Sequence, residues 1–545
     1  MIAGEKSIQP KNSSMQDFIG SFLEASRISL HSEANDLNRI PKKGARILVV
    51  NRLFGPVDPF LLLKSLSSVR QDVAVLTSFD YSNHTELEPS IILLNVDDSE
   101  DTITGQFQNL INQEMLLVIF PAKQSTLSRI TANMAMDKRW DQKLMRVLFQ
   151  LDCPIQPIHI SSESPPSLFH SKVFSFDGMI AFFQDMNLKE KRVHLRIGKP
   201  IEEMVKHSFT RPEDFARYVR AKLYALGSAL DVNSFFSSLF INHRETVKSA
   251  IAPAIDSRII EKELNALDKS HCLLQQAEYS IFLAAASSIP QTLKEIGRLR
   301  EVTFREVGEG SGNALDLDEY DMYYHQLILW DHEQKKIAGG YRIGFGNEIM
   351  KLYGKRGFYL RSLFKFRKPF NEIFKQAIEL GRSYITPDYQ KARLPLFLLW
   401  KGILSVLLQH TAYHYLIGPV SISNEYSSFS RQLIVGFIKK YYWNSELAQH
   451  VKPRKAFVPP ASDLDIDAIV EQLSPEMREV DKIIEEVEPQ NYKLPVLIKK
   501  YIKQEAKIIG FNVDPSFSNV LDGLILLDIN DVPLETLENL KKDLH

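Results

Sequence analysis

The second half of the sequence holds a set of charged and aromatic residues suited to acid–base chemistry and to binding charged groups. In chain order the set is Arg300, Phe304, Asp318, Asp321, His325, Arg342, Glu379 and Arg382. A carboxylate such as Glu379 can accept a proton from a reacting group or hold an amino group. Arginines such as Arg342 and Arg382 offer planar forks that pair with carboxylates. A purely structural ion network of the same residues is the alternative that the sequence leaves open.

These residues need strands and helices that bring them together. The patterns predict elements over 279–285, 290–306, 324–330, 336–344, 377–385, 395–408, 413–420, 427–442, 494–506 and 524–529. Glu379 and Arg382 fall on the predicted strand 377–385. At three residues apart they face opposite sides of a regular strand. A β-bulge at Gly381 would let both side chains reach one site.

The order of these residues resembles that of two families that share the GNAT fold. One family N-acylates ornithine or similar amino acids to make lyso-aminolipids, and its members are often called putative hemolysins. The other comprises the acyl-homoserine lactone synthases. Segments 417–423 and 511–515 look like the aminolipid family. The resemblance covers most of residues 276–545 and implies a GNAT-like α/β domain.

The resemblance also implies a role for each residue of the set. Three residues would be catalytic, namely Glu379, Arg382 and Asp321. Glu379 is the best candidate for the base or for holding the amino group. Five residues would bind substrate, namely Arg300, Phe304, Asp318, His325 and Arg342. For His325 at a strand start, a structural hydrogen bond is the alternative.

Two further basic residues, Lys391 and Arg393, lie just before the apolar helix predicted from Pro395. A helix start presents free N–H groups and positive charge, which suit the phosphate of a phosphopantetheine arm. We therefore expect these residues to contact the acyl donor, with a solvated loop as the alternative. The run 394–408 is too short to span a bilayer.

The reaction implied by the resemblance moves a long acyl chain, with or without a 3-hydroxyl group, from acyl carrier protein to the α-amine of an amino acid such as ornithine or glycine. Direct transfer is expected, because no cysteine lies in the motif to carry the acyl group. No bound cofactor and no metal site are expected. There are two rival hypotheses. One is an enzyme like the acyl-homoserine lactone synthases. The other is a membrane-associated scaffold in which this site and a second acyltransferase-like site in the first half of the chain are both inactive.

Four short blocks in the first half resemble the lysophospholipid and glycerolphosphate O-acyltransferases. They are Asn51-Arg52 with Asp58, then 119–123, 153–158 and 196–201. In that family the pattern is Asn-His, four residues, Asp, and the histidine takes the proton of the acceptor hydroxyl. Arg52 replaces the histidine and cannot act as a base, and Lys123 replaces a glycine. His159 and His170 lie outside the motif. A degenerate, silent site at Asn51, Arg52, Asp58 and Lys123 is therefore expected.

The whole chain of 545 residues is long enough for two or three domains. We expect an amphipathic segment at 1–39, a degenerate acyltransferase-like layered α/β domain at 40–210 and a helical connector at 211–275. The GNAT-like α/β domain would follow at 276–545, with an excursion at 451–490. The strands predicted in the first domain are 46–50, 73–77, 91–96, 115–120, 155–160 and 193–197.

Composition narrows the partners and the compartment. The formal net charge of −1 provides no field that would recruit nucleic acid. The two cysteines, Cys153 and Cys272, form no metal or redox motif, so a reducing compartment is expected. The expected partners are acyl carrier protein, the amino acid and a membrane surface. Their combination predicts a cytoplasmic protein that is peripheral on the inner face of the cytoplasmic membrane.

Overall fold

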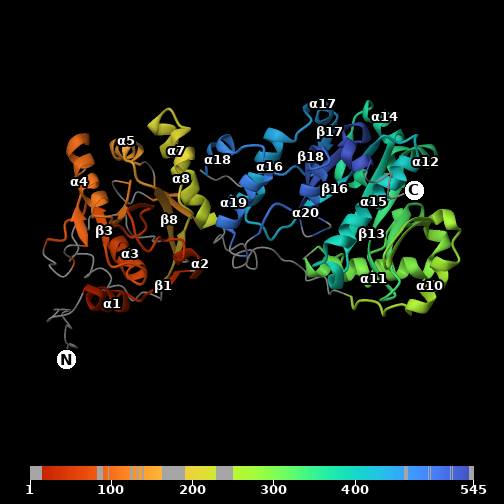
Figure 1. Ribbon diagram of the computed structural model, residues 1–545, viewed down its shortest axis with the longest axis horizontal. Coiled ribbons are helices and arrows are strands. Elements are labelled where there is room, and N and C mark those ends of the chain that lie inside the picture. The colour runs from red at the N-terminus through yellow and green to blue at the C-terminus, as the bar shows by residue number, and fades with distance from the viewer. Residues whose placement is uncertain are drawn as a thin grey trace. The chain divides into compact units, whose positions relative to one another are not determined.

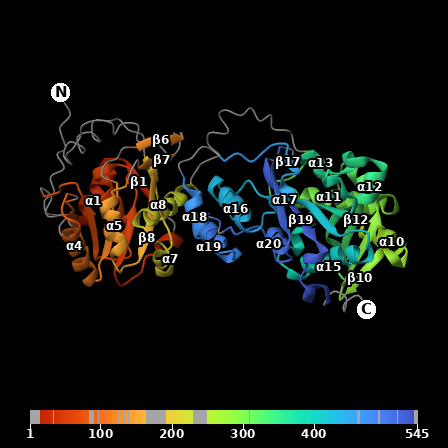
Figure 2. The ribbon, with the colours of Figure 1, turned by 90° about the horizontal axis from the view of Figure 1, so that it is seen from above.

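The chain folds into two compact units, which the computed structural model shows as ribbons in Figures 1 and 2. The first unit draws on residues up to 235 together with 427–433 and 459–492, and the second on 236–426, 434–458 and 493–545. The structure describes residues 15–32, 34–82, 87, 90–95, 97–122, 127–131, 134–137, 140–162, 191–228, 249–307, 309–459, 464–488, 490, 492–515, 517 and 519–538.

The second unit is built on an eight-stranded sheet of order β10-β11-β12-β13-β15-β16-β19-β18. Its strands are β10 (Cys272–Gln276), β11 (Tyr279–Ala285), β12 (His325–Asp331), β13 (Lys336–Phe345), β15 (Ala377–Ile385), β16 (Tyr415–Ile422), β18 (Lys507–Asp514) and β19 (Val520–Asp528). The predicted strands 279–285 and 377–385 are confirmed at both ends. Strand β18 had no counterpart among the predictions. All neighbouring strands are antiparallel except β15 and β16.

The parallel pair β15 and β16 separates after three residues. Their register runs from Ala377 opposite Tyr415 to Glu379 opposite Ile417. Beyond that point β15 stays paired with β13 as far as Ile385, and β16 stays paired with β19 through its last residue. The two halves of the sheet therefore diverge along a line between β15 and β16.

Strand β15 contains the expected bulge. Gly340 faces Tyr384 and Arg342 faces Gly381, so two residues of β13 span three of β15. Arg382 within this step has a φ of 49°, in the left-handed region that a side chain rarely adopts. The prediction of a bulge is confirmed, but the left-handed residue is Arg382 rather than Gly381.

Helices cover both faces of this sheet. On one face, α10 (Ser257–Asn265) and α11 (Pro290–Glu306) pack on alternate residues of β11 and β12, such as Phe282 and Ile328. On the other face lies α15 (Arg393–Gln409), whose Gly402 approaches Ile281 and Leu327. The predicted helix 290–306 is confirmed at both ends. The apolar run after Pro395 is a buried helix, as the sequence indicated.

Short elements complete the second unit. Between β13 and β15 lie α12 (Gly346–Leu352), α13 (Leu360–Leu363), β14 (Phe364–Phe366) and α14 (Phe370–Lys375). After β16 come α16 (Ser428–Tyr441), of which the part from Ile434 belongs to this unit, and then α17 (Ser445–Ala448), β17 (Val451–Pro453) and α20 (Val496–Ile502). A phenylalanine cluster that includes Phe358, Phe364, Phe370 and Phe374 fills the interior beneath α13 and α14.

The first unit has a seven-stranded sheet of order β1-β9-β8-β2-β5-β3-β4. Its strands are β1 (Ile28–Ser32), β2 (Arg46–Val50), β3 (Val73–Thr77), β4 (Ile91–Leu93), β5 (Leu116–Ile119), β8 (Ile155–Ser162) and β9 (Lys191–Ile197), beside a hairpin of β6 (Leu127–Thr131) and β7 (Met134–Asp137). Its helices include α1 (Met15–Ala25), α3 (Asp58–Leu66), α4 (Glu100–Asn112), α5 (Gln142–Gln150), α7 (Glu203–His207) and α8 (Pro212–Ser228). Within this sheet, β8 and β9 form the antiparallel pair. The predicted α/β class is therefore confirmed.

The amphipathic amino-terminal segment is part of the first unit. The apolar face of α1 is buried, and Phe18 and Phe22 place their rings 6.1 and 5.3 Å from Phe60. Strand β1 then joins the sheet beside β9. The apolar stripe thus packs on the protein. In the part of the chain that the structure describes, no helix combines the length and apolarity needed to cross a membrane.

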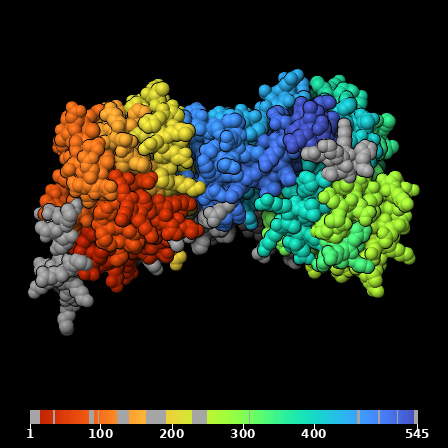
Figure 3. Space-filling model, in the orientation of Figure 1, coloured from red at the N-terminus to blue at the C-terminus, as the bar shows by residue number. Residues whose placement is uncertain are grey.

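Two predicted connections differ from the structure. The expected helical connector at 211–275 consists of α8 in the first unit and α10 in the second, and 229–248 lie outside the described residues. The expected loop at 451–490 instead contains α18 (Ile466–Gln472) and α19 (Met477–Val487), which pack on α8. In Figure 3 these blue residues lie beside the yellow residues of α8. Because many residues of α19 are charged, the sequence pattern did not indicate that one side of this helix is buried. On that side Glu486 forms a 2.5 Å ion pair with Lys222.

Candidate functional site

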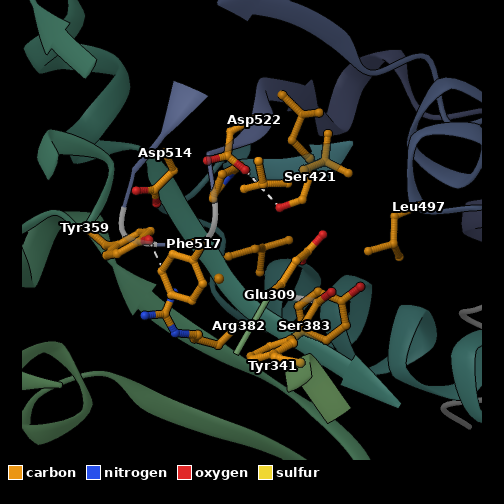
Figure 4. A pocket seen from close by; sticks show the side chains of 18 of the residues that line it. Glu309, Tyr341, Tyr359, Arg382, Ser383, Ser421, Leu497, Asp514, Phe517 and Asp522 are labelled. Atoms are coloured by element: carbon orange, nitrogen blue, oxygen red, sulfur yellow. Dashed lines mark hydrogen bonds between the residues drawn. The ribbon is translucent and has the colours of Figure 1, made fainter. Parts of the chain in front are cut away.

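A cavity of about 200 Å³ lies where β15 and β16 diverge (Figure 4). Residues 380–383 of β15 and 418–421 of β16 line it. Phe304, Tyr341, Tyr501 and Phe517 supply aromatic surface, and three carboxyl side chains line the same space, namely Glu309, Asp514 and Asp522. Arg382 is the cationic side chain among the described residues of the lining. The cavity can therefore hold a small polar group against an apolar wall.

Arg382 belongs to a buried network of three arginines and three aspartates. Arg300 Nε lies 2.9 Å from Asp316 and its Nη1 lies 2.9 Å from Asp321. Arg382 lies 3.1 Å from Asp316 and 3.3 Å from Asp318. Burial raises the pKa of Asp321, but Arg300 and Arg342 outweigh burial and lower it to about 2. Three arginines thus face three aspartates, and the formal charges of the network cancel.

Arg342 ties this network to a tyrosine cluster. Its Nη1 lies 2.5 Å from Asp318 and 3.3 Å from Asp321. Its guanidinium carbon lies 5.2 to 5.5 Å from the ring centres of Tyr320, Tyr324 and Tyr359. Arg342 is 1% exposed, and the pairing of its Nη1 with Asp318 and Asp321 ties the network together.

Glu379 points away from the cavity. Tyr324 donates a hydrogen bond to one carboxylate oxygen, and the Leu360 amide donates to the other at 2.7 Å. The side chain is 1% exposed. Burial raises the pKa of Glu379 to about 7, against the opposing effects of these hydrogen bonds and of Arg342. The predicted base, Glu379, is therefore held in the interior and does not line the cavity.

Asp522 faces the cavity from β19. It lies opposite Ser421 of β16, whose hydroxyl donates a hydrogen bond to Oδ1 at 2.9 Å. Figure 4 shows this pair at one end of the cavity, with Arg382, Tyr359 and Phe517 grouped at another side. Burial raises the pKa of Asp522 to about 8, and the nearby carboxyl groups of Asp514 and Glu309 add to the effect. A carboxyl group with this pKa can exchange protons near neutral pH.

Glu309 contributes a second titratable group to the lining. It follows helix α11 in the sequence. Burial raises its pKa to about 7, and the charge of Glu425 acts in the same direction. Two carboxyl groups of the cavity thus titrate near neutrality.

The remaining predicted site residues lie at different distances from this cavity. Phe304 lines it, as expected of a substrate-binding residue. His325 begins β12 and packs edge-on against Phe345, and burial lowers its pKa. Lys391 and Arg393 are exposed at the start of α15, where Ala392 provides no side-chain cap for the helix amides. The structure therefore unites the arginines and aspartates but leaves His325 apart.

Sequence reasoning missed four residues that the structure brings to the site. Asp316 completes the charge balance of the network, and the Tyr359 hydroxyl accepts a hydrogen bond from Arg382 Nη1 at 3.2 Å. Asp522 and Glu309 supply the titratable groups of the lining. Asp522 carried a signal, because it interrupts the apolar part of β19, residues 520–527. A carboxyl group in such a run needs a partner or a function.

The motif of the first unit is a rigid turn. The Asp58 carboxylate accepts hydrogen bonds from three backbone amides, those of Leu53, Phe54 and Gly55, at 2.7 to 3.0 Å. The Asn51 side chain bonds both backbone groups of Ile160. Five residues separate Arg52 from Asp58, one more than in the family pattern. Asp58 is thus occupied with the turn.

Arg52 is buried beside this turn. It donates to the Ala122 carbonyl at 2.8 Å, and its guanidinium lies 5.0 and 4.7 Å from the rings of Phe79 and Phe120. His159, which could be considered as a replacement base, is 2% exposed, and burial beside Arg196 lowers its pKa to about 3. Lys123 and His170 lie outside the described residues. Neither Arg52 nor His159 therefore presents an exposed base.

Comparison with known proteins agrees with the geometry of the second unit. The family model described as Acetyltransferase (GNAT) domain matches residues 299–400. Two proteins named glycine N(alpha)-acyltransferase, from Phocaeicola vulgatus and Bacteroides thetaiotaomicron, are each 28% identical over 305 and 306 residues. The matches cover 52% of this chain, and 90% and 86% of those relatives. The second unit therefore contains a GNAT acyltransferase domain, and the matches support N-acyl transfer as its chemistry.

A solved structure, that of the CoA-dependent acyl-homoserine lactone synthase BjaI with SAM and isopentyl-CoA, was also found. It is 10% identical, and the match covers 48% of this chain and 87% of that chain with a TM-score of 0.26. A likeness of that size carries no argument about fold or function.

Proposed function

We propose that the chain moves a long acyl chain from the thioester of acyl carrier protein to the α-amine of a small amino acid, which yields a lyso-aminolipid. The observation that carries the proposal is the cavity between the diverging strands β15 and β16. Its lining draws on residues of the matched GNAT domain, including Phe304 and Arg382. Carboxyl groups that titrate near neutrality supply the proton transfer that amide formation needs.

The acyl donor is proposed to approach along the start of α15. Lys391 and Arg393 are exposed there, and the first amides of the helix lack a side-chain cap. Free N–H groups, the helix dipole and two cations together favour a phosphate. A phosphopantetheine arm anchored at this point would extend its thioester along β15 toward the cavity.

The acceptor is proposed to be a small amino acid. The cavity has room for a small molecule and offers carboxyl groups to its ammonium. The two curated relatives are named for glycine, and glycine is therefore the first acceptor to test, followed by ornithine. The carrier protein, the acceptor and the lipid product would place the enzyme in the cytoplasm, on the inner face of the membrane.

The first unit is proposed to be silent in O-acyl transfer. Arg52 takes the place of the histidine, and the Asp58 carboxylate is engaged by three backbone amides. A second acyl chain would then have to be added by another protein.

Expression in a bacterial host that lacks aminolipids, followed by mass spectrometry of total lipid, tests the proposal. We expect new N-acyl amino acids. Ser383→Trp, which fills the cavity, should abolish them, whereas the matched change Ser362→Trp at an exposed position of α13 should not. No new lipid from well-folded protein would favour the scaffold hypothesis instead.

A further inference from the structure

We propose that Asp522 is the general base that takes the proton from the acceptor amine, and that Ser421 holds its carboxylate in place. This assignment rests on the proposed function and moves the proton transfer from β15 to β19. Asp522 would be a catalytic residue in contact with the reacting nitrogen, and Ser421 a positioning residue.

The geometry of Asp522 suits this role. Its side chain is 3% exposed, and it lines the cavity together with residues 418–421 of β16. Ser421 donates to Oδ1 at 2.9 Å and is the one hydrogen-bond donor to this carboxylate among the described residues. The other oxygen, Oδ2, can therefore accept a proton from a group in the cavity. The pairing of β16 with β19 fixes both residues on rigid strands.

The residue predicted as base, Glu379, lacks that freedom. Tyr324 and the Leu360 amide occupy both of its oxygens, and it does not line the cavity. To act as the base, Glu379 would have to give up both hydrogen bonds and cross the wall formed by β15. Its position fits a buried residue that anchors Tyr324 and the segment at Leu360.

The surroundings of Asp522 favour proton exchange at neutral pH. The charged groups around it come from three elements: Asp514 on β18, Glu309 after α11, and Arg382 on β15. Burial and the two carboxyl groups raise the pKa of Asp522 to about 8, while the Ser421 hydrogen bond and Arg382 oppose the rise. General bases work best with a pKa near the operating pH.

The proton and bond changes balance as follows. The ammonium of the acceptor gives one proton to the Asp522 carboxylate, which passes it to solvent. The free amine forms a C–N bond to the thioester carbonyl carbon. The C–S bond then breaks, and the leaving sulfur takes a second proton from the nitrogen. Each turnover yields one amide, one thiol and one proton.

Steady-state kinetics of the full-length protein test the assignment. Thiol release from palmitoyl-acyl carrier protein is followed from pH 5.5 to 9.5 with the amino acid that proves active. We expect Asp522→Asn to lower kcat by roughly 10²- to 10⁴-fold and to remove the ascending limb of the pH profile. Glu379→Gln should keep that limb. Thermal unfolding of each variant checks that it folds.

Two milder variants give a signature that a structural role would not produce. Ser421→Ala removes a hydrogen bond that lowers the pKa of Asp522, so the midpoint of the limb should move to higher pH. Glu309→Gln removes a charge that raises this pKa, so the midpoint should move to lower pH. Opposite movements would identify Asp522 as the titrating group.

The outcomes separate this inference from the proposed function. If wild-type protein releases thiol in the presence of an amino acid but Asp522→Asn keeps kcat and the limb, the base is elsewhere and the inference fails alone. Loss of the limb in Glu309→Gln or Glu379→Gln would assign the base to that residue. If wild-type protein acylates no amine, the proposed function fails and the inference falls with it.

Discussion

Glu379 and Arg382 lie three residues apart on β15, and Arg382 falls within the step where two residues of β13 span three of β15. Glu379 accepts from Tyr324, and Arg382 lies 3.2 Å from the Tyr359 hydroxyl. Only the arginine of the two reaches the cavity. Glu379 thus lies behind the cavity wall and Arg382 lines the cavity, while the carboxyl groups of the lining come from other elements.

The arginine–aspartate network should contribute more to the stability of the second unit than an exposed ion pair does. Arg300→Met leaves Asp316 and Asp321 short of a partner in the interior, so it should cost about 3–5 kcal/mol of unfolding free energy. Arg258→Met removes an exposed pair on α10 and should cost far less. Urea unfolding measures the free energy of unfolding of both variants, and hydrogen exchange in β12 and β13 provides a second measurement of each. Equal losses would mean that the network contributes no more than a surface pair.

The burial of Glu379 should make stability depend on pH. Its pKa rises from 4.5 to about 7 on folding, so the stabilising contribution is complete below pH 4.5 and is lost as pH rises through 7. Between pH 5 and pH 8.5, Glu379 should lower the free energy of unfolding of the wild-type protein by on the order of 3 kcal/mol. Glu379→Gln should remove this decrease. Thermal unfolding of both proteins at the two pH values gives the comparison. Parallel pH curves would show that Glu379 keeps an ordinary pKa.

Restoring a histidine in the first unit should not restore O-acyl transfer. In Arg52→His the new imidazole would lack an orienting carboxylate, because Asp58 is bound by the amides of 53–55. The variant should also lose the packing of the guanidinium between Phe79 and Phe120 and unfold at a lower temperature. Mass spectrometry after incubation with a lyso-aminolipid and acyl donor is the check. An ester product from wild type or variant would contradict a silent first unit.

Charge reversal at the start of α15 should weaken donor binding. The double change Lys391→Glu and Arg393→Glu should raise KM for acyl carrier protein about tenfold, which corresponds to about 1.4 kcal/mol, and leave kcat nearly unchanged. The exposed pair Lys42 and Lys43 in the first unit provides a matched control when both are changed to Glu. If KM shifts equally in both double variants, the effect is one of overall charge and the donor site lies elsewhere.

The sequence was informative where local pattern decides structure. The strand β15, the helix α11 and the order of the motif residues from Arg300 to Arg382 all follow from short-range pattern or motif order. A bulge was expected so that Glu379 and Arg382 could reach one site; the bulge is present, but only Arg382 of the two lines the cavity. These features needed no knowledge of distant contacts.

The rest depended on contacts between residues far apart in the chain. Glu379 was predicted to be the base, but its orientation is set by Tyr324 and Leu360, which come from other segments. Asp522 meets Ser421 across 101 positions of sequence. Residues 466–487 were predicted to be a polar excursion. The sequence pattern could not show that their buried side packs on α8, which lies far earlier in the chain.

The central claim is amide formation from an acyl thioester, and the most direct test uses purified protein, palmitoyl-acyl carrier protein and single amino acids. Free thiol and N-acyl amino acid are measured together by absorbance and mass spectrometry. We expect thiol release only when an amino acid is present. The amount of thiol released should equal the amount of amide formed, mole for mole. Thiol release without an amine, or none with any amino acid tested, would contradict it.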